Sequence, residues 1–146
     1  MPNDSPDLVI GNEYSRTALE TAFAIKFGYQ VNGIVVRKLH SWPERRLILL
    51  FSRAEGPYSD DVGLEEIRYE GSGLQGDQKL SGVNQVLATQ GRDVGFHFFR
   101  QPAGYSTWLY LGKGQVVDVT EETKEGRRVL VFRLKLGRET RGTSQD

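Results

Sequence analysis

One short stretch of the chain combines aromatic and carboxylate side chains in a way that suits recognition of a planar base. Tyr58 and Tyr69 flank two adjacent carboxylates, Asp60 and Asp61. Two aromatic rings can sandwich a nucleobase, and each stack contributes roughly 1–3 kcal/mol. A carboxylate accepts a hydrogen bond from the N4 amino group of cytosine, and backbone N–H groups near Gly56 can meet the O2 and N3 acceptors. The spacing of these four residues, taken alone, has a simpler interpretation: the two tyrosines lie at the edge of a core and the aspartates cap a turn.

A second group of residues could hold a divalent metal. Asp77-Gln78-Lys79 supplies an Asp-x-Lys, and Asp60 or Asp61 stands upstream as a further carboxylate. Two carboxylates can hold Mg²⁺ while a lysine orients or activates the attacking water. That arrangement normally places the Asp-x-Lys on a strand, whereas Asp77 opens a predicted helix and is better explained as an acid that favours the helix dipole. A Mg²⁺-dependent nuclease that uses Asp61, Asp77 and Lys79 is kept as an alternative.

Other catalytic and cofactor motifs are weak or missing. His40 suits a turn and His97 suits a packed position in an aromatic strand, and with no cysteine these two histidines argue against a zinc site. Residues 71–76 match GxGxxG, but the strand before them is short and charged and no βαβ unit follows, which argues against a dinucleotide site. We therefore expect no catalytic residue, no metal and no cofactor in this chain.

Composition limits the class of protein. A length of 146 residues suits one domain, and the lack of cysteine excludes a disulfide framework. No run of about 18 apolar residues occurs, and the polar N-terminus lacks the features of a signal peptide, so we expect a cytoplasmic protein. The 19 basic and 19 acidic residues cancel, which gives no reason to expect a nucleic-acid partner. The acidic cluster between Glu55 and Glu70 is typical of a solvated loop.

The order of the predicted elements favours an α+β fold. Helical periodicity occurs in residues 15–27, with Ser15 at the N-cap position, and in residues 76–89, which end before Gly91. The second of these segments places four apolar residues on one face, Leu80, Val83, Val86 and Leu87. Because helices and strands do not alternate regularly, we expect a mostly antiparallel sheet or barrel with two main helices. Strand-like patterns occur in residues 31–37, 46–51, 66–69, 94–100, 108–119 and 128–136.

The order of several motifs resembles the SRA (SET- and RING-associated, or YDG) domain, a PUA-like fold that recognises modified cytosine in DNA by flipping the base out of the helix. The motifs are Tyr58-x-Asp60-Asp61, Tyr69-Glu70-Gly71-Ser72-Gly73, and Asp77-Gln78-Lys79-Leu80 with Asn84 and Leu87. The resemblance covers roughly residues 9–138 and implies a twisted, mostly antiparallel PUA-like β-barrel with two main helices. It leaves 1–8 as a flexible N-terminal tail and 139–146 as a flexible C-terminal tail or the start of a linker. Flanking segments agree with the family pattern at residues 11–16, 28–34, 108–119 and 131–136.

The resemblance implies a role for each pocket residue. Tyr58 and Tyr69 stack on the two faces of the flipped base, and Asp61 accepts the N4 amino hydrogen and so requires cytosine. The backbone of Gly56 and Pro57 forms part of the pocket rim. Basic side chains hold the flanking phosphates of double-stranded DNA, and the candidates are Arg16, Arg37, Lys38, Lys79 and Arg100.

Two departures from the family pattern bear on specificity. Glu70 follows Tyr69 where eukaryotic members have a small residue, so Glu70 could crowd a methyl group or accept a hydrogen bond from a hydroxymethyl group; alternatively, it points into solvent. The finger loop that eukaryotic members insert into the major groove is reduced to three residues, with Gln75 as a groove candidate, so we expect a broader sequence context than CpG. Tyr29 or Gln30 could fill the gap that the flipped base leaves.

The compact form resembles prokaryotic members, which commonly serve as the reader part of modification-dependent restriction endonucleases. We therefore expect a nucleoid-associated reader of 5-methylcytosine or 5-hydroxymethylcytosine, with an HNH-type nuclease domain either fused to it or associated with it. A PUA-like domain that binds RNA or protein is a further alternative. In the reader interpretation the acidic cluster becomes the recognition loop, because selectivity then comes from a pocket that is itself acidic. Zero net charge is compatible with such a DNA partner.

Overall fold

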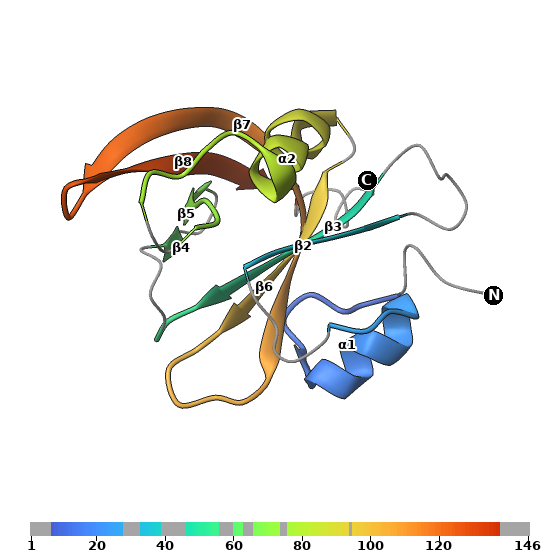
Figure 1. The fold of residues 1–146 in the computed structure, drawn as a ribbon. Coiled ribbons are helices and arrows are strands. Elements are labelled where there is room, and N and C mark those ends of the chain that lie inside the picture. The colour runs from blue at the N-terminus through green and yellow to red at the C-terminus, as the bar shows by residue number, and fades with distance from the viewer. Residues whose placement is uncertain are drawn as a thin grey trace.

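The computed structural model describes residues 7–27, 33–38, 46–55, 60–62, 66–73, 76–93 and 95–137. These residues form the two helices and eight strands drawn in Figure 1. None of the helices in this part of the chain is long and apolar enough to cross a membrane. The elements in chain order are β1 (Glu13–Tyr14), α1 (Arg16–Phe23), β2 (Ile34–Lys38), β3 (Arg46–Arg53), β4 (Asp61–Val62), β5 (Glu66–Glu70), α2 (Gly82–Asp93), β6 (Phe96–Gln101), β7 (Trp108–Lys124) and β8 (Arg127–Leu136).

All strands belong to one sheet in the order β2-β3-β6-β7-β8-β5-β4, with β1 paired to β7. Every pairing is antiparallel except that of β3 with β6. The end strands β2 and β4 do not pair with each other within the described ranges, so the sheet is open there and not a closed barrel. The predicted α+β class, with two helices on a mostly antiparallel sheet, is confirmed.

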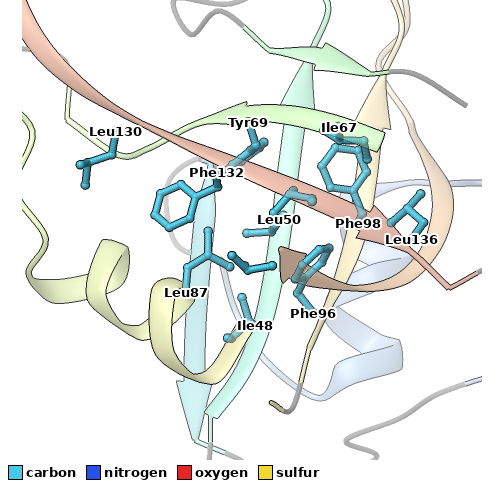
Figure 2. Packing of buried hydrophobic residues seen from close by; sticks show 12 residues of the cluster. Ile48, Leu50, Ile67, Tyr69, Leu87, Phe96, Phe98, Leu130, Phe132 and Leu136 are labelled. Carbon is cyan, nitrogen blue, oxygen red and sulfur yellow. The ribbon is translucent and has the colours of Figure 1, made fainter. Parts of the chain in front are cut away.

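Strand β3 is buried on both faces, and each face belongs to a different core. Ile48 and Leu50 lie in the α2-side core, which also contains Leu87 of α2 (Figure 2). The alternate residues of β3 lie in the α1-side core with Leu19 and Phe23 of α1. The two helices therefore cover opposite sides of the sheet (Figure 1). This double burial explains why residues 46–51 read as a continuous apolar run and do not alternate.

The first helix begins where the sequence predicts and ends earlier. The Ser15 side chain accepts a hydrogen bond from the Ala18 N–H at 3.0 Å, which confirms it as the N-cap. The helix ends at Phe23 because Ala24 adopts a left-handed conformation with φ 58°. The predicted continuation to residue 27 is wrong, since the Phe27 N–H instead donates to the Glu20 carboxylate at 3.0 Å.

The second helix begins later than predicted, at Gly82, because the preceding residues bond to β8. The Gln78 N–H donates to the Arg128 carbonyl at 2.8 Å, and residues 76–81 are not helical. Leu80 consequently lies outside the helix and is 55% exposed, so its predicted place on the apolar face of the helix is wrong. The helix also runs through Gly91, where a Cβ would lie 2.7 Å from Val116 of β7. Gly91 thus permits close packing of α2 on the sheet and does not end the helix.

His97 is a packed strand residue, as the sequence indicates. Its ring is 5% exposed, lies edge-on to Phe23, and places Nδ1 2.8 Å from the Tyr110 hydroxyl. Burial lowers the pKa of His97 to about 3, so the ring is neutral at physiological pH. His40 lies outside the described residues.

Leu87 of α2 is fully buried in the α2-side core, and truncating it should destabilise the protein. Leu87→Ala removes a side chain that is 0% exposed, and should lower the free energy of unfolding by about 2–5 kcal/mol. The matched control is Leu80→Ala, at an exposed leucine, which should change it by less than about 0.5 kcal/mol. Urea unfolding of both variants measures the difference, and equal effects would contradict this placement of the helix.

Candidate nucleic-acid interface

Tyr69 lies near the end of β5 with its side chain inside the α2-side core. Its ring is 2% exposed and meets Phe98 edge-on, with centroids 6.0 Å apart and an interplanar angle of 77°. The hydroxyl donates a hydrogen bond to the Phe51 carbonyl at 3.1 Å. Figure 2 shows the ring among the side chains of the core, beside Phe132. The orientation of Tyr69 is therefore fixed both by its hydroxyl and by its edge contact.

Two described residues near the end of β5 or the Tyr69 hydroxyl adjoin segments that the sequence assigns to the DNA-binding site. Gly33 follows one segment, and a Cβ added to it would lie 3.6 Å from the Tyr69 hydroxyl. Asp60 follows the other, and its Oδ1 accepts a hydrogen bond from the Glu70 N–H at 2.9 Å. The described end of one segment therefore lies beside the tip of the Tyr69 side chain, and that of the other lies at the end of β5. Six predicted site residues lie outside the described residues: Gly56, Pro57, Tyr58, Tyr29, Gln30 and Gln75.

Asp60 is the carboxylate that the structure bonds to the end of β5, at the backbone N–H that follows Tyr69. Besides its bond to Glu70, it accepts a hydrogen bond on Oδ2 from the Ser52 hydroxyl at 2.8 Å. Burial raises the pKa of Asp60 above its ordinary 3.8, and the Glu70 N–H, the Ser52 hydroxyl and the Arg100 guanidinium oppose that rise. A carboxylate with two donors retains free lone pairs, so Asp60 can still accept from a ligand.

Asp61 lies on the other face of the sheet. It is the Cα partner of Arg68 in the antiparallel β4–β5 pair, and directly opposed residues share a face. Arg68 and Tyr69 are neighbours on β5, so their side chains point to opposite faces. Asp61 is exposed on the Arg68 face. The β4–β5 register thus places Asp61 on the face opposite to Tyr69. The residue before it, Asp60, is the one on the Tyr69 face.

Glu70 also points away from Tyr69, although not into solvent. Its side chain is 2% exposed and lies 2.8 Å from Lys124 Nζ and 3.8 Å from Arg127 Nη2. Gln78 Nε2 donates to it at 3.3 Å. The sequence left two alternatives for Glu70, a pocket position shared with Tyr69 and a position in solvent. The structure shows neither of them. Alternation along β5 explains why, since consecutive side chains take opposite faces.

The Gly-rich motif after β5 is fastened to its surroundings by two amides. Gln78 Nε2 donates to the carbonyls of Gly71 and Gly73 at 2.8 and 3.0 Å, and its Oε1 accepts from the Leu130 N–H at 2.8 Å. Asn84 accepts from the Ser72 N–H at 2.8 Å and donates to the Ser72 carbonyl at 3.0 Å. These residues therefore set the course of the chain after Glu70 and hold it to β8.

The Asp-x-Lys motif lies in this fastened loop, on neither a helix nor a strand. Asp77 Oδ1 accepts a hydrogen bond from the Arg128 N–H at 2.7 Å, while Lys79 is exposed. Within the described ranges, no group of three or more His, Asp and Glu side chains could hold a metal ion. Asp77 is thus explained by a structural contact, but not by the predicted helix dipole.

Two of the predicted phosphate contacts bond within the protein. Arg37 donates to the carbonyls of Val36 and Lys26, both at 2.9 Å. Arg100 Nη1 donates to the Ser52 hydroxyl at 2.6 Å. Arg16 lies 3.5 Å from Glu20 and its side chain is 38% exposed, so it and Lys79 are the more accessible candidates. The structure does not describe Gln75 or the side chain of Lys38.

Comparison with protein families matches nearly the whole chain. The family model described as "ScoMcrA-like, SRA domain" matches residues 10–140. This chain belongs to the SRA family. A search of curated protein sequences finds no match to this SRA domain.

Solved structures share the fold at low sequence identity. The SRA domain of SUVH5 in a complex with fully methylated CG DNA matches this SRA domain with a TM-score of 0.69 at 23% identity, covering 93% of this chain and 94% of that chain. Its complex with fully hydroxymethylated CG DNA matches with a TM-score of 0.70 at 23% identity, covering 93% of each chain. SUVH6 of Arabidopsis thaliana matches with a TM-score of 0.64 at 21% identity, covering 93% of this chain and 27% of that chain. The SRA fold is therefore shown.

The ion pairs of Glu70 should contribute to stability. Glu70→Gln removes the carboxylate charge beside two cations that are only partly exposed, at 22% for Lys124 and 17% for Arg127. Because this removes the carboxylate from two ion pairs, we expect it to lower the free energy of unfolding by about 2–3 kcal/mol. The control Glu66→Gln breaks an exposed pair with Arg133 and should cost less than about 1 kcal/mol. Urea titration distinguishes the two, and a cost for Glu70 no larger than that for Glu66 would contradict the role assigned here.

The raised pKa of Asp60 predicts how pH changes stability. Because the folded state holds the Asp60 proton more tightly than the unfolded state, this group stabilises the fold at acid pH, and that contribution is lost as pH rises through the folded-state pKa. The variant Asp60→Asn does not titrate. The free energy of unfolding of the wild type minus that of Asp60→Asn should therefore fall as pH rises from about 4 to about 7. A difference that grows over this range would show that the ionised carboxylate is net stabilised by the fold.

Proposed function

We propose that this SRA domain binds double-stranded DNA containing 5-methylcytosine or 5-hydroxymethylcytosine and flips the modified base out of the helix. Tyr69 and Tyr58 stack on the base, and the backbone of Gly56 and Pro57 completes the rim. Asp60, in place of Asp61, accepts the N4 amino hydrogen. The bound DNA in the SUVH5 structures, methylated in one and hydroxymethylated in the other, supports this substrate class.

The observation that carries the proposal is the Asp60 carboxylate. It is partly buried next to Tyr69, and burial raises its pKa. A fold that needed only a capped turn could use a neutral amide at this position without burying a charge. An acceptor oriented by two hydrogen bonds suits an amino group that enters from the DNA.

The energetics of flipping are compatible with this pocket. Extrusion of a base costs a few kcal/mol of stacking and pairing. Two aromatic stacks return roughly 1–3 kcal/mol each, and a charge-assisted hydrogen bond adds to them. Because Tyr69 is 2% exposed without DNA, entry of the base must displace the groups that cover its ring.

Glu70 gives no reason to expect a preference for the hydroxymethyl group, because its carboxylate is held by Lys124 and Arg127 on the far face of β5. The short segment at Gln75 supports a broader context than CpG. We also propose that the domain is the reader part of a prokaryotic modification-dependent restriction system with an HNH-type nuclease. The match to the ScoMcrA-like family model supports this affiliation.

The proposal is tested by titrating matched duplexes that carry cytosine, 5-methylcytosine or 5-hydroxymethylcytosine at one position, at fixed salt concentration. We expect the wild type to bind the modified duplexes at least about tenfold more tightly than the plain one, equivalent to about 1.4 kcal/mol. Asp60→Asn should reduce affinity for modified duplexes about 10- to 100-fold, because an amide can present its donor where the base needs an acceptor.

The adjacent variant Asp61→Asn is the matched control and should bind like the wild type. The opposite result, with binding lost in Asp61→Asn and kept in Asp60→Asn, would assign the reading carboxylate to Asp61. Equal wild-type affinity for all three duplexes would overturn the reader function. Cleavage of any duplex in Mg²⁺ that is lost in Asp77→Asn would favour the nuclease alternative.

A further inference from the structure

Behind Asp60 lies a chain of hydrogen bonds that crosses two neighbouring strands. Ser52 of β3 and Arg100 of β6 are Cα partners in the parallel pair between these strands. Arg100 Nη1 donates to the Ser52 hydroxyl at 2.6 Å, and that hydroxyl donates to Asp60 Oδ2 at 2.8 Å. Ser52 is 1% exposed, so the connection is shielded from solvent. The pocket proposed above gives neither Arg100 nor Ser52 a role in base recognition.

The direction of each hydrogen bond in this chain is fixed by chemistry. A guanidinium group has only donors, so Arg100 must use a lone pair of the Ser52 oxygen. The single hydroxyl hydrogen of Ser52 is then left to point at Asp60 Oδ2. The other oxygen, Oδ1, receives the Glu70 N–H, which is also an obligatory donor. Both oxygens of Asp60 therefore face donors, and each can offer a ligand only its remaining lone pairs.

We propose that Arg100 and Ser52 are specificity-determining positioning residues, which hold the Asp60 carboxylate as an acceptor and thereby make the pocket accept cytosine and reject thymine. This inference rests on the proposed function. Cytosine presents an N4 amino donor at the position where thymine presents the O4 acceptor. Since 5-methylcytosine and thymine carry the same methyl group at C5, a pocket that only senses the methyl cannot separate them. A carboxylate held as an acceptor can.

The charges around Asp60 show why Arg100 is needed. Burial and the Glu70 carboxylate raise the pKa of Asp60, whereas Arg100 of β6, the Ser52 hydroxyl of β3 and the Glu70 N–H lower it. A protonated Asp60 would carry a donor and could bond to O4 of thymine. Removing Arg100 leaves Ser52 free to rotate and makes protonation of Asp60 easier. The Arg100–Ser52 pair therefore acts on the base through Asp60 and needs no contact with the base.

The test compares two duplexes that differ only at the flipped position, 5-methylcytosine opposite guanine and thymine opposite guanine. A T·G mismatch is easier to open than a normal pair, so the cost of flipping does not disfavour thymine. Affinities are measured from about pH 5 to pH 8 for the wild type, Arg100→Met, Arg100→Lys and Ser52→Ala. Arg133→Met is the control, because it removes an equal charge from an exposed pair with Glu66.

We expect Arg100→Met and Ser52→Ala to lower the ratio of 5-methylcytosine to thymine affinity about tenfold, which is within the usual worth of one base contact. In both variants the loss of 5-methylcytosine binding on acidification should begin at a higher pH than in the wild type. Arg100→Lys keeps a cationic donor and should retain most of the ratio. Arg133→Met should leave the ratio and the pH profile unchanged.

Two results would overturn the inference. If Arg100→Met weakens binding to every duplex by the same factor and lowers the salt dependence by about one phosphate contact, Arg100 holds the DNA backbone instead. If Ser52→Ala, which removes only a hydroxyl, leaves both the ratio and the pH profile unchanged, the relay has no role, whatever Arg100→Met does to folding. In either case the proposed function is retained if the wild type still binds modified cytosine more tightly than plain cytosine. If the wild type lacks that preference, the proposed function is wrong.

Discussion

The alternation of side chains at the end of β5 is the constraint on which the site depends. Tyr69 points into the α2-side core and Glu70 points to the opposite face, where Lys124 and Arg127 hold it. The Glu70 N–H lies in the plane of the sheet and reaches Asp60. One short strand therefore orients the aromatic platform, places its backbone donor against the carboxylate, and is fastened to β8 through the remaining side chain.

This arrangement places a partly buried charge inside a satisfied polar network. Asp60 is surrounded by donors from three strands, namely the Glu70 N–H of β5, the Ser52 hydroxyl of β3 and, one bond further, Arg100 of β6. The network keeps the carboxylate in one orientation, although burial still raises its pKa. A preoriented acceptor of this kind costs stability in the free protein and gives selectivity when a donor arrives. A loss of stability in exchange for selective binding is expected of a recognition site and not of a capped turn.

The sequence predicted the class of fold and the neighbourhood of the site, but not the details of register. Apolar and β-branched runs of strand length predicted the main strands, and motif order indicated the SRA family. Choosing between Asp60 and Asp61 requires the β4–β5 register, and a shift of one residue reverses every side chain. The start of α2 and the direction of Glu70 depend on long-range bonds to β8, made through Gln78 and Lys124. The sequence predicts Arg100 as a phosphate contact, because a local pattern does not show that Arg100 lies beside Ser52.

The central claim is that a flipped cytosine is read by Asp60 next to Tyr69. A crystal structure of this domain bound to a duplex with one 5-methylcytosine tests it most directly. The account predicts an extrahelical base stacked on Tyr69, with N4 at about 2.7–3.2 Å from the Asp60 carboxylate and Ser52 still bonded to that carboxylate. A 5-methylcytosine that stays within the helix, or an N4 group bonded to Asp61 or Glu70, would contradict it.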